Sequence, residues 1–107
     1  MSKARSTKSS GNVFADLGVP NAEEHLAKAD LVIGIAALVK SKGLTQKEVS
    51  GLIGLAQPDV SKLLRGHFDG YSFERLFGFL HALGENVVIT VSAAKSTEQA
   101  RTQLEFV

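Results

Sequence analysis

Apolar and polar positions between residues 21 and 84 recur with the period of the α-helix. Glycines divide this stretch into four segments, residues 21–42, 45–53, 57–65 and 73–83. Each segment ends at or next to a glycine, which readily takes the left-handed conformation that terminates helices. The pattern predicts four consecutive helices, the first of them the longest.

The first segment is apolar on several sides. Asn21 and Glu24 have the spacing of a capping box, in which each side chain satisfies a free backbone N–H at the start of the helix. One apolar stripe consists of Leu26, Ala29, Ile33 and Ala37, and it is widened by Leu31, Ile35 and Leu38. We expect such a helix to be surrounded by other helices.

The next three segments carry clear start signals. Thr45 with Glu48 forms a second capping box, Pro58 suits a first helical turn, and Ser72 is a plausible N-cap. The residues expected to face the core are Val49, Leu52, Ile53, Val60, Leu63, Leu64, Phe73, Leu76, Phe77, Leu80 and Leu83. The spacing therefore predicts an all-α bundle of four to five helices over residues 21–84.

After Gly84 the pattern changes to period two, which predicts a β-strand over residues 85–92. A lone strand in a helical domain lacks a partner. We expect it to pair antiparallel with the same strand of a second copy and form a two-fold dimer. Pairing with residues 13–17 of the same chain is the alternative. The predicted dimer strand contains Val87, Val88, Ile89, Thr90 and Val91.

The remaining segments look polar. Residues 1–20 are expected to form a flexible arm, and residues 93–107 a frayed polar tail. The domain plan is therefore an arm, a helical domain at 21–84, a dimerising strand at 85–92 and a tail.

Composition narrows the function classes. The 107 residues suit one domain and include no cysteine, which excludes disulfide scaffolds, thiolate zinc sites and cysteine catalysis. The net charge of +1 excludes a histone-like protein. The three histidines are scattered and no phosphate-binding glycine loop is present, so we expect no enzyme, cofactor or metal. The longest apolar run, residues 31–39, is too short to span a membrane, and we expect a cytoplasmic protein.

Two short helices joined by a glycine-containing turn are typical of a helix-turn-helix. Ser50 is small where the helices would touch, and Gly54 permits a sharp exit. Residues 43–66, GLTQKEVSGLIGLAQPDVSKLLRG, resemble the helix-turn-helix of the Xre/Cro/CI-type repressors. The resemblance extends over about residues 22–83 and implies a lambda-repressor-like fold that binds DNA. Ala56, where a capping Ser or Thr is usual, and Gly51 inside a helix depart from that family's pattern.

The flanks resemble a narrower branch. The segments GNVFADLGVPNAEEHLAKADL and LGENVVITV look like those of HigA-type antitoxins, which repress their own toxin–antitoxin operons. This resemblance implies a second partner, a RelE/HigB-like ribonuclease toxin. We expect residues 13–17 to hold that toxin, because they are partly apolar and loosely structured.

The resemblance implies that the third helix inserts its N-terminal residues into the major groove of DNA. Gln57 matches the base-reading position, and its amide can bond adenine N6 and N7 together. Lys62 would reach a guanine or a phosphate from the same exposed face. Asp59 and Ser61 share that edge, and the Asp59 carboxylate could accept from cytosine N4. Taken singly, these polar residues would more often be solvated, and the whole motif favours DNA contact.

Phosphate contacts are expected at the rim of this surface. Gln46 and Ser72 lie at helix N-termini, where free N–H groups attract anions. Lys42, Lys47 and Arg65 add positive charge. Residues 40–66 contain five basic and two acidic side chains, whereas the first helix opens with acidic residues.

The expected function is therefore a sequence-specific repressor that binds a palindromic operator as a homodimer, and an antitoxin. Two alternatives remain: a solitary regulator without a toxin, and an interaction adaptor that no longer binds DNA.

Overall fold

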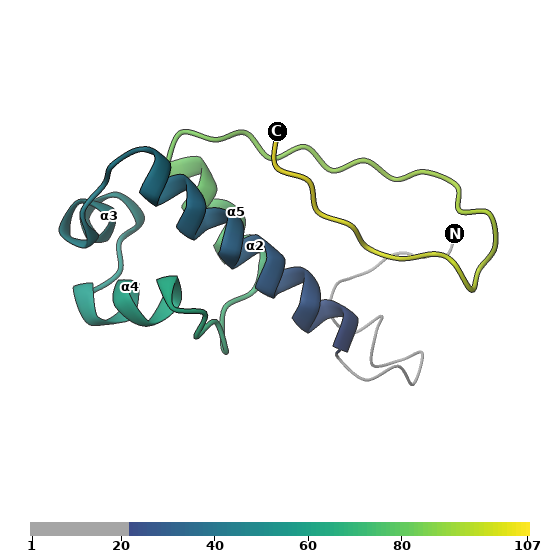
Figure 1. Ribbon diagram of the computed structural model, residues 1–107, viewed down its shortest axis with the longest axis horizontal. Coiled ribbons are helices and arrows are strands. Elements are labelled where there is room, and N and C mark those ends of the chain that lie inside the picture. The colour runs from purple at the N-terminus through teal and green to yellow at the C-terminus, as the bar shows by residue number, and fades with distance from the viewer. Residues whose placement is uncertain (1–21) are drawn as a thin grey trace.

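A computed structural model describes residues 22–107 of the chain. The predicted arm at 1–20, the Asn21 cap and the possible pairing or toxin segment at 13–17 lie outside the described residues. Figure 1 shows four helices, α2 (Ala22–Ser41), α3 (Gln46–Ile53), α4 (Gln57–Leu64) and α5 (Phe73–Ala82). The all-α prediction is confirmed.

The helix ends follow from local chemistry. At α3 the Glu48 N–H donates to Thr45 Oγ1 at 3.1 Å, and the Thr45 N–H donates to the Glu48 carboxylate at 2.8 Å. This is the predicted capping box, and it satisfies two backbone donors at once. Gly54 follows α3 with a φ of 78°, the left-handed conformation that ends the helix.

A single core joins the four helices. The long helix α2 packs against α4 and α5, and α3 packs against both α4 and α5. Val49, Val60 and Leu76 are fully buried where these helices meet. The remaining core side chains are Leu31, Val32, Ile35, Val39, Leu55, Leu63, Phe68, Phe79, Leu80 and Leu83.

The predicted apolar stripe of α2 is wrong at several positions. Leu26 and Ile33 are 64% and 67% exposed, and Ala37 is also exposed. The buried positions are instead Ala27, Leu31, Val32, Ile35 and Val39. Because α2 is apolar nearly all round, periodicity alone did not determine which side faces the core. One face of α2 therefore presents large apolar side chains to solvent. Leu52 of α3, also expected inside, is 48% exposed.

The predicted β-strand is not supported. Residues 85–94 are extended but carry no ladder of hydrogen bonds to any other part of the described chain. Val87 is half-buried, whereas the side chains of Val88, Ile89, Thr90 and Val91 are exposed. A strand exists only when its backbone groups meet a partner strand, and residues 22–107 of one chain contain none.

The C-terminal segment, expected to be a frayed polar tail, is mostly exposed but contacts α2 near its end. After a turn in which the Gln99 N–H donates to Ser96 O at 3.1 Å, the chain runs back toward α2 (Figure 1). Leu104 packs against the core, and Phe106 lies on α2 at Gly34. Apolar residues at alternate positions near the end of a polar segment account for this return.

Candidate nucleic-acid interface

The interface is built on the crossing of α3 and α4. Figure 1 shows α3 nearly end-on and α4 from the side, so the two helices cross steeply. Ser50 is half-buried between them, and its hydroxyl donates to the carbonyl of Leu55. That bond ties α3 to the turn that precedes α4. The small residue and the Gly54 turn predicted from sequence thus fix where α4 begins.

The leading end of α4 faces solvent. Val60 and Leu63 hold the helix to the core, at 0% and 1% exposure. Gln57 at the first helical position is exposed, and neither the described chain nor any cap side chain covers it. The cap residue Ala56 makes no side-chain hydrogen bond, and the Asp59 N–H instead donates to the carbonyl of Ala56 at 3.0 Å.

The predicted base-contacting residues divide between the flanks and the centre of the exposed face. At about 100° per residue, Gln57 and Asp59 lie on opposite flanks of the face opposite Val60 and Leu63, and Lys62 lies between the centre of that face and Asp59. Ser61 is half-buried and presents less of its side chain than the others. The helix therefore presents Gln57 at one edge of its exposed face and Asp59 at the other, with Lys62 on the Asp59 side.

Pro58 was missed as a candidate. It is exposed and lies near the centre of the same face, between the flanks formed by Gln57 and Asp59. Its ring has no hydrogen-bond donor, but it can make apolar contact with a thymine methyl group. From sequence, Pro58 was interpreted only as a residue that suits the first helical turn, and DNA contact was not predicted for it.

The N-terminus of α3 forms one edge of the surface. Gln46 and Lys47 occupy its first two positions, and both are exposed. The Glu48 carboxylate is held back on the Thr45 N–H. The predicted phosphate contacts Gln46 and Lys47 are thus free to approach an anion.

The predicted contact Lys42 has an internal partner. Its Nζ lies 3.4 Å from the Glu85 carboxylate, just beyond α5. Both side chains are about one third exposed. A phosphate would have to compete with Glu85 for this ammonium group, whereas Arg65 forms no ion pair among residues 22–107.

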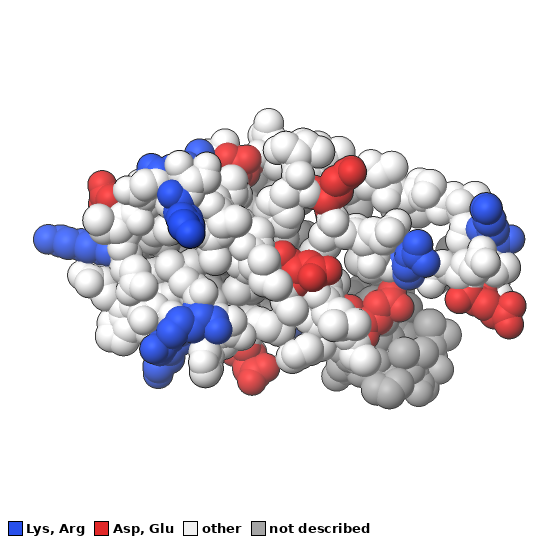
Figure 2. Space-filling model, in the orientation of Figure 1, with Lys and Arg blue, Asp and Glu red and all other residues white. Residues whose placement is uncertain are grey.

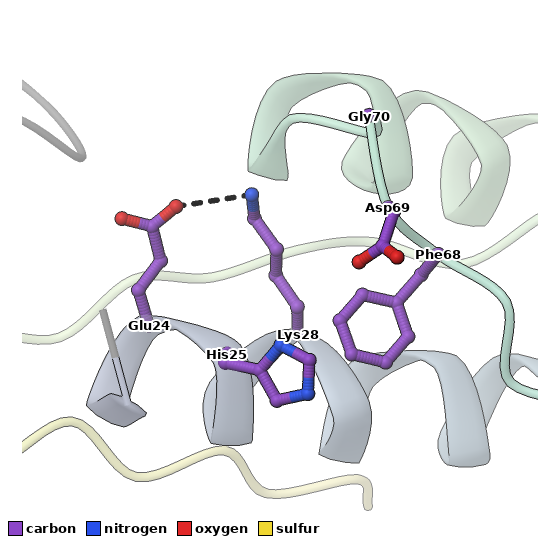
Figure 3. A pocket seen from close by; sticks show the side chains of 6 residues that line it. All are labelled: Glu24, His25, Lys28, Phe68, Asp69 and Gly70. Carbon is purple, nitrogen blue, oxygen red and sulfur yellow. Dashed lines mark ion pairs between the residues drawn. The ribbon is translucent and has the colours of Figure 1, made fainter. Parts of the chain in front are cut away.

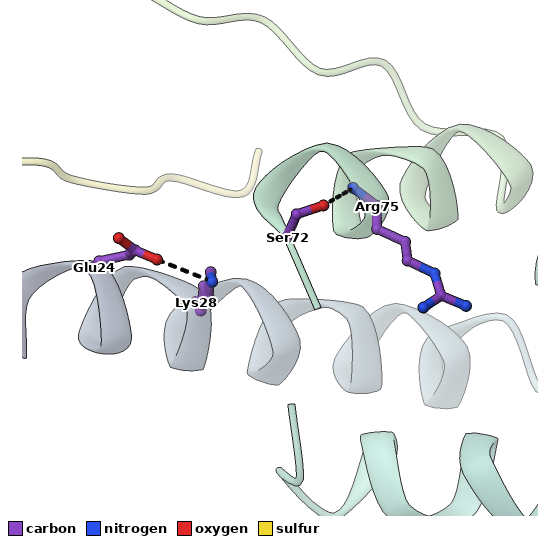
Figure 4. A network of polar contacts seen from close by, with 4 residues as sticks. All are labelled: Glu24, Lys28, Ser72 and Arg75. Carbon is purple, nitrogen blue, oxygen red and sulfur yellow. Dashed lines mark hydrogen bonds and ion pairs between the residues drawn. The ribbon is translucent and has the colours of Figure 1, made fainter. Parts of the chain in front are cut away.

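The start of α5 carries the predicted phosphate contact Ser72 and, three residues on, Arg75. The Arg75 N–H donates to Ser72 Oγ at 3.1 Å, so Ser72 is the N-cap that the sequence predicted (Figure 4). The Arg75 guanidinium lies 4.9 Å from the centroid of the Tyr71 ring and 5.8 Å from that of Phe79. Aromatic faces hold an arginine without neutralising it. Arg75, which the sequence reading missed, is therefore a further candidate phosphate contact, and its spacing from Ser72 was the available signal.

Charge is unevenly distributed over the described molecule. On the face drawn in Figure 2, most Lys and Arg side chains lie at the end where α3 and α4 lie, Asp and Glu side chains lie over the middle, and a few of both signs lie at the opposite end. Around the first turns of α2, a depression holds Glu24 and Asp69 beside His25 and Lys28 (Figure 3). Lys28 pairs with Glu24 at 3.0 Å, and the ring centroid of His25 lies 4.8 Å from that of Phe68. The basic side chains around α3 and α4 attract phosphates, so this distribution favours DNA on the α3–α4 side.

Comparison with known proteins gives the family. A family model described as "Helix-turn-helix domain" matches residues 13–92. A solved structure named "Putative XRE Family Transcriptional Regulator" superimposes with a TM-score of 0.71 and 31% sequence identity, over 82% of this chain and 98% of that one. The chain belongs to the XRE-type helix-turn-helix family. No curated protein sequence matches it significantly.

As a member of this family, the chain is a DNA-binding transcriptional regulator. The steep crossing of α3 and α4 and the exposed start of α4 agree with the docking of a recognition helix into a major groove. In the part of the chain that the structure describes, no helix is long and apolar enough to cross a membrane.

Proposed function

We propose that this XRE-type regulator represses an operon by occupying a palindromic operator as a homodimer, and that it also neutralises a ribonuclease toxin encoded beside it. The observation that carries the first part is the uncovered leading end of α4, where Gln57 is exposed at the first helical position. A bound dimer would repress by blocking the promoter.

Base reading is assigned to Gln57 and Lys62, with Asp59 and Ser61 adjusting specificity. Phosphate binding is assigned to Gln46, Lys47, Arg65, Ser72 and Lys42, together with Arg75. Electrophoretic shift of a fragment from the protein's own promoter region tests this assignment. Specific binding should fall steeply with salt, with a slope of about −0.9 per phosphate neutralised. Binding that is equal for the promoter and an unrelated fragment would contradict the proposal and favour an adaptor role.

The homodimer is supported by the exposed apolar segment at residues 86–91. Val88, Ile89 and Val91 are 84%, 71% and 91% exposed, which is unusual for three large apolar side chains within four residues. Pairing with the same segment of a second copy would supply the missing ladder and cover these side chains. Two recognition helices would then read half-sites about 34–36 Å apart. A monomer mass in light scattering at high protein concentration would contradict this dimer.

The toxin-binding role rests on the HigA-like flanks and on the apolar face of α2. Leu26 and Ile33 are exposed there, and Ile33 borders a groove lined by Val32, Leu64 and Phe68. Exposed apolar surface of this kind marks protein-interaction sites. The groove is also lined by Arg65, which is assigned to phosphate binding, so a toxin bound there would meet the edge of the DNA-binding surface.

The toxin role is tested by coexpression with the neighbouring gene. If that gene encodes a small basic ribonuclease, the wild-type chain should restore growth. An Ile33→Ser variant should restore growth less well and still shift operator DNA, and Gln57→Ala should show the reverse pattern. A neighbouring gene without ribonuclease activity would leave a solitary regulator as the function.

A further inference from the structure

Gly34 is the one glycine within the described helices at which another residue fills the space of a side chain. A Cβ built at residue 34 would overlap three atoms of the Phe106 ring. At Gly51 in α3 and Gly78 in α5, a Cβ would meet nothing within 4 Å. Glycine inside a helix lowers stability relative to alanine. The close approach of Phe106 gives a physical reason for a glycine at the middle of α2.

Two further contacts define the same docking site. The Thr102 N–H donates to the Glu23 carboxylate of α2 at 3.0 Å. Leu104, two residues before Phe106, packs against the core and is half-buried. Residues 102–106 thus lie along α2 as an extended chain, with alternate apolar side chains against the helix and a backbone donor fixed at its start.

The segment that leads to this site makes far fewer contacts than the site itself. Between Val87 and Leu104 every residue is exposed, and Val88, Ile89 and Val91 contact no other apolar surface that would bury them. Residues 85–101 would reach roughly 55 Å when fully extended. None of the contacts made by Thr102, Leu104 and Phe106 requires that they belong to the same chain as α2.

We propose that in the dimer the Gly34 site of each copy is filled by Phe106 of the second copy, so that the two chains exchange their C-terminal segments. Exchange keeps every docking contact seen within one chain. It also brings the two apolar segments at 86–91 together, which a closed monomer leaves in water. Covering those side chains drives dimerisation, and antiparallel pairing sets the end of each segment beside the start of the other, so the chain that follows it is delivered to the second copy. This inference rests on the proposed homodimer.

The direct test mixes two isotopic forms of the full chain. Equal amounts of uniformly ¹³C,¹⁵N-labelled and unlabelled protein are combined at low concentration, so that copies can exchange, and then concentrated. An isotope-filtered NOE experiment should show contacts between Gly34 Hα of the labelled chain and the Phe106 ring of the unlabelled chain. A dimer mass without these contacts would overturn the exchange and leave the strand-paired dimer intact. A monomer mass would overturn both.

Two variants give an independent measurement. Phe106→Ala protein keeps the Gly34 site and lacks the ring, and Gly34→Ala protein keeps the ring and lacks the site, so neither variant can dock the segment by itself. In an exchanged heterodimer the ring of the second protein can enter the site of the first, so a mixture of the two should have a dimer dissociation constant at least about tenfold lower than either variant alone. Phe106→Ala mixed with Gly78→Ala is the matched control and should show no such gain. A mixture of Phe106→Ala and Gly34→Ala that dimerises no more tightly than either variant alone would overturn the proposal.

Discussion

Residues 22–84 and residues 85–107 are held in place by different means. In the first region, local signals and the core agree: Thr45 and Ser72 cap helices that bury Val49 and Leu76 completely. In the second region no regular structure forms, most side chains are exposed, and a few contacts near Phe106 bring the chain back to α2. Self-sufficient packing thus fixes the part that reads DNA, and the rest of the described chain offers surfaces for partners.

This difference follows from what each kind of element needs. A helix satisfies its backbone hydrogen bonds within its own segment, so short sequence patterns determine it. An extended segment satisfies them only with a partner strand. The same alternation at 86–91 can therefore remain unpaired in one chain and form a strand in a dimer.

The largest contrast is expected in stability. Leu76→Ala should lower the free energy of unfolding by about 2–5 kcal/mol, because it leaves a cavity where α5 meets the core. The matched change Val88→Ala removes a side chain that is 84% exposed and should cost less than about 0.5 kcal/mol. Urea denaturation at a concentration where the protein is monomeric measures both. Similar losses would mean that the C-terminal segment is part of the cooperative core.

The next contrast lies within the DNA-binding surface. Gln57→Ala should cost about 1–3 kcal/mol of operator binding and relax the preference at one base position. Arg65→Ala should weaken binding to all sequences alike and reduce the salt slope by about 1. Binding titrations on operators with single-base changes separate the two effects. Equal losses across all operators for both variants would contradict the division between base reading and phosphate binding.

Lys42 provides an internal control for that division. Its ammonium group is already paired with Glu85 at 3.4 Å, so Lys42→Ala should reduce DNA affinity less than Arg65→Ala. Glu85→Gln, which removes the competing carboxylate, should increase affinity. A decrease in affinity for Glu85→Gln would show that the pair positions Lys42 for the phosphate.

The helices and the caps at Thr45 and Ser72 could be predicted from sequence because each depends on residues close along the chain. Thr45 with Glu48, and Gly54 nine residues after Thr45, were sufficient to place α3 and its turn. The side of α2 that packs against the core could not be predicted, because Leu26 and Ile33 are as apolar as the buried Leu31 and Ile35. The Phe106 contact with Gly34 joins residues far apart in the sequence, and only the three-dimensional structure brings them together. Arg75 was missed because its stacking on Tyr71 depends on the geometry of a loop.

A smaller difference in the free energy of unfolding is expected between alanine substitutions at two helical glycines. Gly78→Ala should raise the free energy of unfolding by about 0.5–1 kcal/mol, since alanine is the better helix former and its Cβ meets nothing within 4 Å. Gly34→Ala should lose this gain because its Cβ displaces Phe106. Thermal or urea unfolding gives the difference, and NMR shifts of the Phe106 ring report its release. An equal gain for both variants would show that the ring contributes nothing to the fold.

The smallest expected change concerns α4, whose N-cap is an alanine where the family pattern usually has Ser or Thr. Ala56 precedes α4 without a side-chain hydrogen bond, whereas Thr45 and Ser72 cap α3 and α5. Ala56→Ser should add about 0.5–1 kcal/mol of stability, because a hydroxyl can accept from an N–H of the first turn. That same hydroxyl would occupy a donor at the end of α4 that faces DNA. Unfolding and operator-binding measurements on one variant therefore decide whether this end is left uncapped for binding: higher stability with unchanged affinity would show that the missing cap has no role in DNA recognition.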